Sequence, residues 1–345
     1  MNILIANDGP TAFYYIRLGM ARAFSACGHS VTIWDTRQEP ALDMFDMANP
    51  DIFIGQTYNM SRTLAQAIKE RPHLKVIMKA GDWGPLADEI DTNKYPILKA
   101  SEQEIKTILD LRDETGKPDF VHIHYHPDYI EGTHGYWQDH GVPTESILNA
   151  ADIFDYKPGV VKPEFHTDLA FVGGYWGYKA QTFDKWLLPL CGQYNMKIFG
   201  NQAWPIPEYC GFIPTELVKD ALSSALICPN LSEPHSQVYG FDVIERPFKL
   251  LACGAFVISD YVAGLEKLFP NGEIQFAKTP EDFKNLIDHY LQNPDQRHDL
   301  KAAGYAAVMQ GHTYLHRIIQ IFKSLRLTKQ AHEAELTMNQ IRSRV

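Results

Sequence analysis

Residues 240–260, GFDVIERPFKLLACGAFVISD, form the stretch around which this chain is organised. The pattern predicts a helix with three charged residues near its start, closed by Gly254, and then a buried strand from Phe256 to Ser259. The charged residues are Glu245, Arg246 and Lys249. In open α/β domains, phosphate binds where a helix starts beside the carboxyl end of a parallel strand. We therefore expect the functional centre in this stretch.

Short apolar runs alternate with amphipathic segments over most of the chain. Strands are predicted at 2–6, 30–35, 51–55, 75–79, 120–124, 169–172, 197–199, 225–228 and 274–276. Further helices are predicted at 14–27, 61–71, 101–114, 182–194, 216–223, 280–290 and through 294–327. Strands that alternate with helices through short links predict parallel sheets covered on both faces.

A polar, proline-bearing segment from Asp155 to Pro163 divides this pattern, and 345 residues favour two domains over one. We predict a Rossmann-like domain at 1–155, a second at 164–310, and a cleft between them. Helices at 311–345 are expected to cross back to the first domain. The end of the chain, 330–345, is predicted to be an amphipathic or fraying helix.

The composition is that of a soluble globular protein, with 45% hydrophobic and 21% charged residues. A net charge of -10 argues against a general polyanion binder, although it leaves room for a local basic cleft. Five scattered cysteines without a CxxC pair favour reduced thiols, and hence a cytoplasmic protein. No targeting segment or spanning apolar run is visible, so any membrane contact is expected to be peripheral.

Four motifs in the second half of the chain resemble GT-B glycosyltransferases, and within them the CgeB-like group, named after a spore-maturation protein. In order they are Phe171-Val172-Gly173-Gly174 followed by Lys179; the Arg246-x-Phe248 helix that ends in Ala252-Cys253-Gly254-Ala255-Phe256; Leu265-Glu266-x-Leu268-Phe269; and His312-Thr313-Tyr314 followed by Arg317. The resemblance covers residues 145–320 and is thin before them.

The resemblance implies a hexosyl- or pentosyltransferase. It would move a sugar from a nucleoside diphosphate sugar, with UDP-sugar expected, to an acceptor hydroxyl, without metal or another cofactor. The second domain would hold the donor and the first the acceptor. The acceptor class stays open between a glycan, a lipid-linked glycan, a small molecule and a modified nucleic-acid base, as do the anomeric outcome and the oligomeric state.

The physical chemistry of the donor motifs agrees with this role. The charge on a leaving pyrophosphate must be neutralised, and Lys179 and Arg246 are cations that could do so. Gly173 and Gly174 would let the backbone approach the phosphates. In the alternative interpretation the glycines form only a tight turn, Lys179 is solvated, and Arg246 pairs with Asp242 on its own helix. Tyr178 and Asp242 complete the predicted donor residues.

Lys249 departs from the family pattern. Retaining relatives have a glutamate there, which is expected to hold the donor ribose, and an ammonium cannot accept hydrogen bonds from two hydroxyls. Glu245, one turn earlier, could take its place. The alternative is a simple Glu245–Lys249 salt bridge at i,i+4 spacing.

The acceptor side is predicted from the first domain. Asp8, after the first strand, is the candidate base, with a helix cap as the alternative. His122, His124 and His126 are expected to alternate along one strand, too far apart for a zinc site. We assign His124 a catalytic role, and expect Gly9, Asp82, Trp83 and His126 to bind the acceptor. His126, His134 and His140 are expected to share one loop.

Other chemistries lack their motifs. No GxSxG, Walker A, HExxH or GxGxxG pattern occurs at a matching place. Two alternatives to a transferase stay open: a nucleotide-sugar epimerase of the same fold, and a non-catalytic nucleotide-binding or scaffold protein, for which Lys249 is the argument.

Overall fold

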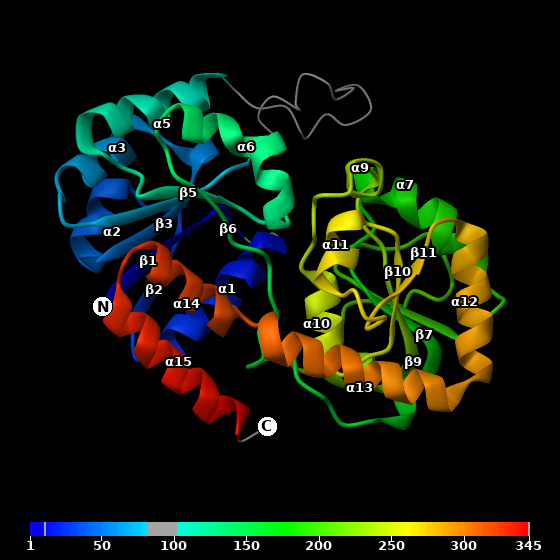
Figure 1. Cartoon of the computed structure of the whole chain (residues 1–345). Helices are drawn as coiled ribbons and strands as arrows, with labels where there is room; N and C mark the ends of the chain where they lie inside the picture. The colour runs from blue at the N-terminus through cyan, green and yellow to red at the C-terminus, as the bar shows by residue number, and fades with distance from the viewer. Residues whose placement is uncertain (10–11, 82–101, 344–345) are drawn as a thin grey trace. The chain divides into compact units, whose positions relative to one another are not determined.

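The computed structural model describes residues 1–9, 12–81 and 102–343. The chain divides into two compact units (Figure 1). Unit 1 comprises Met1–Leu148 and Tyr314–Val345, and unit 2 comprises Asn149–Thr313. The chain therefore leaves unit 1 once and returns to it for its last helices.

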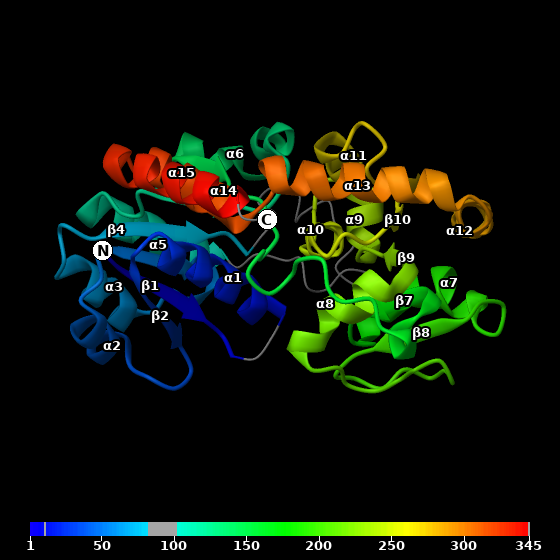
Figure 2. The same cartoon turned by 90° about the horizontal axis from the view of Figure 1, so that it is seen from below.

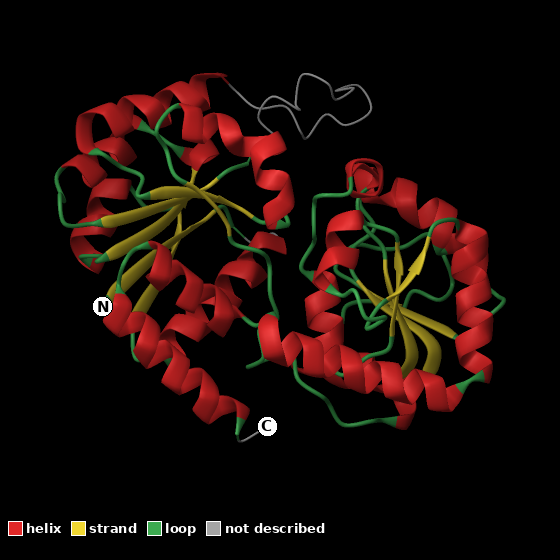
Figure 3. Ribbon diagram, in the orientation of Figure 1, coloured by secondary structure: helices red, strands yellow, loops and turns green. Residues whose placement is uncertain are grey.

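Unit 1 is built on a six-stranded parallel sheet in the order β2-β1-β3-β4-β5-β6. The strands are β1 (Asn2–Asn7), β2 (Ser30–Asp35), β3 (Ile52–Gln56), β4 (Lys75–Lys79), β5 (Phe120–Ile123) and β6 (Thr144–Ser146). The helices are α1 (Ala12–Ala26), α2 (Ala41–Ala48), α3 (Arg62–Lys69), α5 (Glu102–Thr115), α6 (Ile130–Asp139), α14 (Tyr314–Ser324) and α15 (Thr328–Arg342). Two short 3-10 helices, η1 (Thr57–Asn59) and η3 (Pro127–Tyr129), follow β3 and β5. Helices flank the strands on both sides (Figure 3).

The last two helices are part of unit 1. Phe322 of α14 packs against Phe24 of α1 with ring centroids 5.6 Å apart. α15 lies alongside α14 (Figure 2), where Ala331 and Ala334 are buried. The end of the chain is therefore a packed helix up to Arg342 and does not fray from the unit.

Unit 2 repeats the architecture with a five-stranded parallel sheet in the order β11-β10-β9-β7-β8. The strands are β7 (Thr167–Val172), β8 (Met196–Phe199), β9 (Ala225–Asn230), β10 (Val257–Asp260) and β11 (Gln275–Ala277). The helices are α7 (Gly177–Trp186), α8 (Thr215–Ser224), α9 (Pro234–Tyr239), α10 (Arg246–Ala252), α11 (Ala263–Leu268), α12 (Pro280–Gln292) and α13 (Pro294–Gly311), with 3-10 turns η4 (Pro163–Phe165) and η5 (Leu188–Leu190). The prediction of two Rossmann-like sheets is confirmed.

Two local predictions are wrong, and short elements such as α9 were missed. The histidine-rich loop after β5 contains α6, in which His134 is fully buried, and only His140 lies beyond its end. The helix predicted at 182–194 runs from Gly177 to Trp186 instead, because Pro189 cannot continue a helix. The short helix α9 was not predicted, although Pro234 at its first turn is a usual helix start signal.

The core of unit 1 depends on aromatic packing against the sheet. Phe53 of β3 is fully buried, 4.9 Å from the Phe45 ring and 6.3 Å from Trp34 between ring centroids. We expect Phe53→Ala to lower the free energy of unfolding by about 3–5 kcal/mol, because it removes a buried ring and leaves a cavity. Urea unfolding followed by tryptophan fluorescence measures this change.

Met47→Ala is the matched control, since Met47 is 71% exposed on the neighbouring helix α2. We expect it to change the free energy of unfolding by no more than about 0.5 kcal/mol. Equal effects of the two substitutions would contradict this assignment of the core.

Candidate functional site

The carboxyl edge of the unit 2 sheet holds two cations, of which one is buried and the other partly buried. Lys179, in the first turn of α7, is 4% exposed, and its ammonium lies 2.9 Å from Oε1 of Glu233. Burial lowers the pKa of Lys179 to about 8, against the opposing effect of Glu233. The attraction of the Glu233 carboxylate therefore offsets only part of the free-energy cost of removing this ammonium from water.

Arg246 is the second cation and begins α10. Its Nη1 donates to the Leu231 carbonyl at 3.0 Å, and its guanidinium lies 4.6 Å from the centroid of the Phe171 ring. Burial lowers the pKa of Arg246, opposed by Glu233 and other carboxylates. The positive charge of Arg246 also contributes to the lowered pKa of Lys179. The two cations therefore lie near each other, and their shared role toward a phosphate stays a prediction.

Gly173 and Gly174 follow β7 and form the turn next to these cations. A Cβ on Gly173 would lie 2.9 Å from Nη2 of Arg246, so the absence of a side chain lets the guanidinium approach the backbone. Two hydrogen bonds hold the turn: the Gly173 N–H donates to the Phe199 carbonyl, and the Gly173 carbonyl accepts from the indole N–H of Trp204. The turn is more than a tight bend, because it packs directly against the cation.

Tyr178 and Asp242 are joined by a histidine that was not predicted. The Tyr178 hydroxyl lies 2.8 Å from Nδ1 of His235, and Nε2 of His235 lies 2.7 Å from Asp242. The Tyr178 and His235 rings also stack, at 17°. Asp242 precedes α10, so the alternative in which it pairs with Arg246 on one helix is wrong.

Asp260, at the end of β10, is fully buried. It accepts hydrogen bonds from the backbone and hydroxyl of Ser232 and from Gln237. Burial raises the pKa of Asp260, and these donors oppose the shift. Beside it, a hollow of about 300 Å³ is lined by Trp186, Gln237, Tyr261 and Lys278.

Lys249 pairs with Glu245 across one turn of α10, at 3.4 Å. Its ammonium also lies 4.4 Å from the centroid of the Tyr156 ring. Burial acts to lower the pKa of Lys249, but Glu245 and Tyr156 outweigh it and raise this pKa above the usual lysine value. The salt bridge considered from the sequence is therefore present, and it engages the carboxylate that was expected to replace the ribose glutamate.

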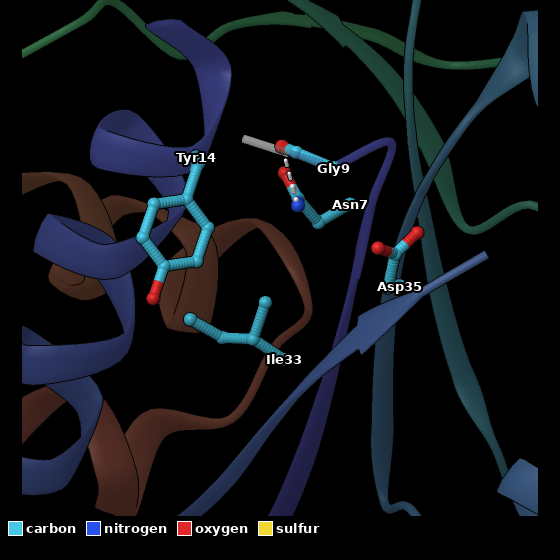
Figure 4. A pocket seen from close by; sticks show the side chains of 5 residues that line it. All are labelled: Asn7, Gly9, Tyr14, Ile33 and Asp35. Atoms are coloured by element: carbon cyan, nitrogen blue, oxygen red, sulfur yellow. Dashed lines mark hydrogen bonds between the residues drawn. The ribbon is translucent and has the colours of Figure 1, made fainter. Parts of the chain in front are cut away.

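In unit 1, Asp8 and Gly9 lie at the carboxyl end of β1. Gly9 lines a hollow of about 290 Å³ together with Asn7, Tyr14, Ile33 and Asp35 (Figure 4). Asn7 holds this turn by donating to the Gly9 carbonyl at 2.9 Å. Asp8 accepts from the Thr36 hydroxyl at 3.2 Å and from the Asn59 side chain. Asp8 is thus held by side chains from neighbouring strands and not only by its own turn.

The histidines after β5 do not share one strand face. β5 ends at Ile123, so only His122 lies within it, and burial together with nearby Lys79 holds the pKa of His122 well below its usual value. His124 follows the strand and contacts the Tyr125 ring. His126 caps η3 by accepting the Asp128 N–H. The expectation of three alternating histidines is wrong, because the strand is shorter than predicted.

Two predicted acceptor residues, Asp82 and Trp83, lie outside the described residues. Residues that the sequence did not single out include Glu233, His235, Arg17, Thr36, Tyr58 and Asn59. Among residues 1–9, 12–81 and 102–343, no three His, Cys, Asp or Glu side chains gather in a way that could hold a metal ion. Within the same residues, no helix has the length and apolar character needed to cross a membrane.

Comparison with known proteins agrees with this architecture. Residues 181–323 match a family model described as glycosyl transferase-like. No curated protein matches the sequence. Among solved structures, a D100A mutant of the T4 phage enzyme BGT in complex with UDP-glucose has a TM-score of 0.59 and 14% identity, over 96% of this chain and 99% of that one.

The chain has the fold of a GT-B glycosyltransferase. Sucrose-phosphate synthase from Thermosynechococcus elongatus is similar, with a TM-score of 0.64 and 12% identity over 95% of this chain and 99% of that one. The Anabaena protein HepE in complex with UDP has a TM-score of 0.61 and 12% identity over 94% and 100% of the two chains. The predicted GT-B fold is confirmed. The enzyme class is supported by the family model over part of the chain, and the CgeB-like subtype stays a prediction.

The turn formed by Gly173 and Gly174 depends on a close backbone approach at Gly200. A Cβ there would lie 2.3 Å from the Gly173 carbonyl oxygen, which cannot move without shifting the turn beside Arg246. We expect Gly200→Ala to lower the free energy of unfolding by about 1–3 kcal/mol through overpacking. Chemical denaturation measures this loss.

Gly177→Ala provides the control in the same region, because a Cβ at Gly177 meets no atom within 4 Å. It should leave stability unchanged or slightly raised, since alanine favours the helix more than glycine does. A Gly200→Ala protein as stable as the control would show that the turn is not held by this contact.

Proposed function

We propose that this chain transfers a sugar from a UDP-sugar to an acceptor hydroxyl, with the donor held by unit 2 and the acceptor by unit 1. The observation that carries the proposal is a pair of cations at the carboxyl edge of the unit 2 sheet, the buried Lys179 and the partly buried Arg246. Buried cations are costly unless an anion compensates them. A pyrophosphate would supply the negative charge that Glu233 supplies only in part.

In the proposed reaction, the acceptor oxygen forms a bond to the anomeric carbon of the sugar. The bond from that carbon to the diphosphate breaks, and UDP leaves with the electron pair. Asp8 takes the proton of the acceptor hydroxyl. Lys179 and Arg246 stabilise the charge that develops on the leaving diphosphate.

We further propose that the reaction needs no metal ion, because two cations already occupy the place where the diphosphate charge develops. One structure of the T4 phage enzyme contains UDP and Mn²⁺, so the point requires a direct test. UDP is the proposed nucleotide on the strength of the UDP and UDP-glucose complexes of similar structures. A cytoplasmic location and the CgeB-like subtype remain proposals.

Incubation with a panel of nucleotide sugars, with and without EDTA, tests the activity. We expect UDP release from a UDP-sugar, at a rate that EDTA does not change. The acceptors to be added are glycans, lipid-linked glycans, small alcohols and DNA with a hydroxylated base, and the correct acceptor should speed UDP release. Chromatography of nucleotides and sugars measures both products. Conversion of the donor to another nucleotide sugar without UDP release would indicate the epimerase. Binding without turnover would indicate a non-catalytic protein. Loss of UDP release in EDTA would refute metal independence.

Donor binding tests the phosphate assignment. We expect Lys179→Met and Arg246→Met each to weaken UDP-glucose binding about 10- to 100-fold, the usual cost of losing a charged hydrogen bond. An Asp8→Asn background prevents turnover during calorimetry. The double variant Lys179→Met/Glu233→Gln keeps the site free of an unpaired buried carboxylate and should bind as weakly as the single variant.

The pKa of Lys179 adds a pH dependence to this binding. Because this pKa is about 8, the ammonium is fully charged below about pH 7, and affinity should fall as pH rises through 8. Lys179→Arg should remove the fall, since arginine stays charged. Lys185→Met, an exposed lysine on the same helix, is the control and should bind as the parent does. Unaltered binding in both cation variants would overturn the phosphate assignment.

A further inference from the structure

The Asp8 carboxylate lies where three neighbouring strands of unit 1 end. β1 leads directly to Asp8, β2 leads to Thr36, and η1 after β3 carries Tyr58 and Asn59. These residues meet because β1 lies between β2 and β3 in a parallel sheet, whose strands end at one edge. The Thr36 hydroxyl and the Asn59 amide both bind Oδ1 of Asp8. The carboxylate is therefore held from both sides of its strand.

The Asn59 amide has a defined orientation, set by the backbone of β1. Gln56 is 1% exposed, and its Nε2 donates to the Ala6 carbonyl at 3.1 Å. This leaves Oε1 of Gln56 to accept from Nδ2 of Asn59 at 3.0 Å. The other proton on Nδ2 of Asn59 is then directed to Asp8, which as a carboxylate can only accept. A backbone carbonyl thus decides which way both amides point.

A second chain of hydrogen bonds starts from the same carbonyl. Nε of Arg17, which is 7% exposed, donates to Ala6 O at 2.5 Å. The Tyr58 side chain is 38% exposed, but its hydroxyl is hydrogen-bonded to both Arg17 and Asp8, and the loss of water around this hydroxyl raises the pKa of Tyr58 to about 12. Arg17 has only donors, so the Tyr58 oxygen accepts from it and the Tyr58 proton goes to Asp8. The phenol keeps this proton at neutral pH.

We infer that Tyr58 and Asn59 are positioning residues that orient the Asp8 carboxylate toward the acceptor hydroxyl. A carboxylate has about four lone-pair sites. Among residues 1–9, 12–81 and 102–343, Thr36, Asn59 and Tyr58 are the side chains that donate to these sites, and a remaining lone pair accepts the acceptor proton. Thr36 is the weakest of the three donors, since its hydroxyl lies equally close, at 3.2 Å, to the Asn7 carbonyl. This inference rests on the proposed function, in which Asp8 is the base.

The kinetics of Asn59→Leu and Tyr58→Phe test the inference. The reaction is UDP release from the UDP-sugar that the wild-type protein turns over, with water as acceptor. We expect each substitution to lower kcat about 10- to 100-fold and to leave KM for the sugar nucleotide within about twofold, because the donor site is in unit 2. In an Asp8→Asn background, the same substitutions should lower kcat no further, because they act through Asp8.

Gln66→Leu, the same change of amide to leucine on α3, is the control and should leave kcat and KM unchanged; Gln66 bonds only the exposed Glu70 in the described contacts. Thermal melts establish that each variant is folded. Normal kcat in both single variants, or a further loss in the Asp8→Asn background, would overturn the inference while leaving the proposed function intact. No UDP release from any nucleotide sugar by the wild-type protein would overturn both.

Discussion

The ion pair between Lys179 and Glu233 is the interaction on which the proposed donor site depends. Lys179 comes from the helix after β7, and Glu233 from the turn after β9, so the pair joins the carboxyl ends of two adjacent strands. Burial makes the ammonium costly, and one carboxylate offsets only part of the cost, as the lowered pKa of Lys179 shows. This incomplete compensation is the physical basis of the proposal that the site binds a further anion.

In unit 1, too, the parallel sheet brings the carboxyl ends of adjacent strands to one edge, but the side chains gathered there are different. There the carboxyl edge gathers a carboxylate and its donors, and the Ala6 carbonyl anchors both Arg17 and Gln56. Neither unit relies on a helix start alone for its candidate site. Segments that follow adjacent strands supply the charged side chains in unit 2 and the Asp8 carboxylate with its donors in unit 1, in agreement with the donor and acceptor roles proposed for the two units.

The stretch 240–260 illustrates how much structure can be predicted from sequence patterns. Its helix and strand were predicted to within a few residues, because Pro247 near the helix start and Gly254 at its end are strong local signals. The partnership of Arg246 with Lys179 followed from the order of motifs, although more than sixty residues separate them. The hydrogen bond of Asp242 with His235 was not predicted, because His235 lies on α9, a short helix that was not predicted.

The sequence by itself determined the two parallel sheets and pointed to most of the charged residues of the proposed donor site, because periodicity and turn signals are local. Only the tertiary structure decided which charges pair and which side chains hold Asp8. Glu233, Tyr58 and Asn59 carry no local signal of their roles. Each acquires its role from a neighbouring strand that is distant along the chain, and the order of strands in a sheet is set by packing of the whole unit.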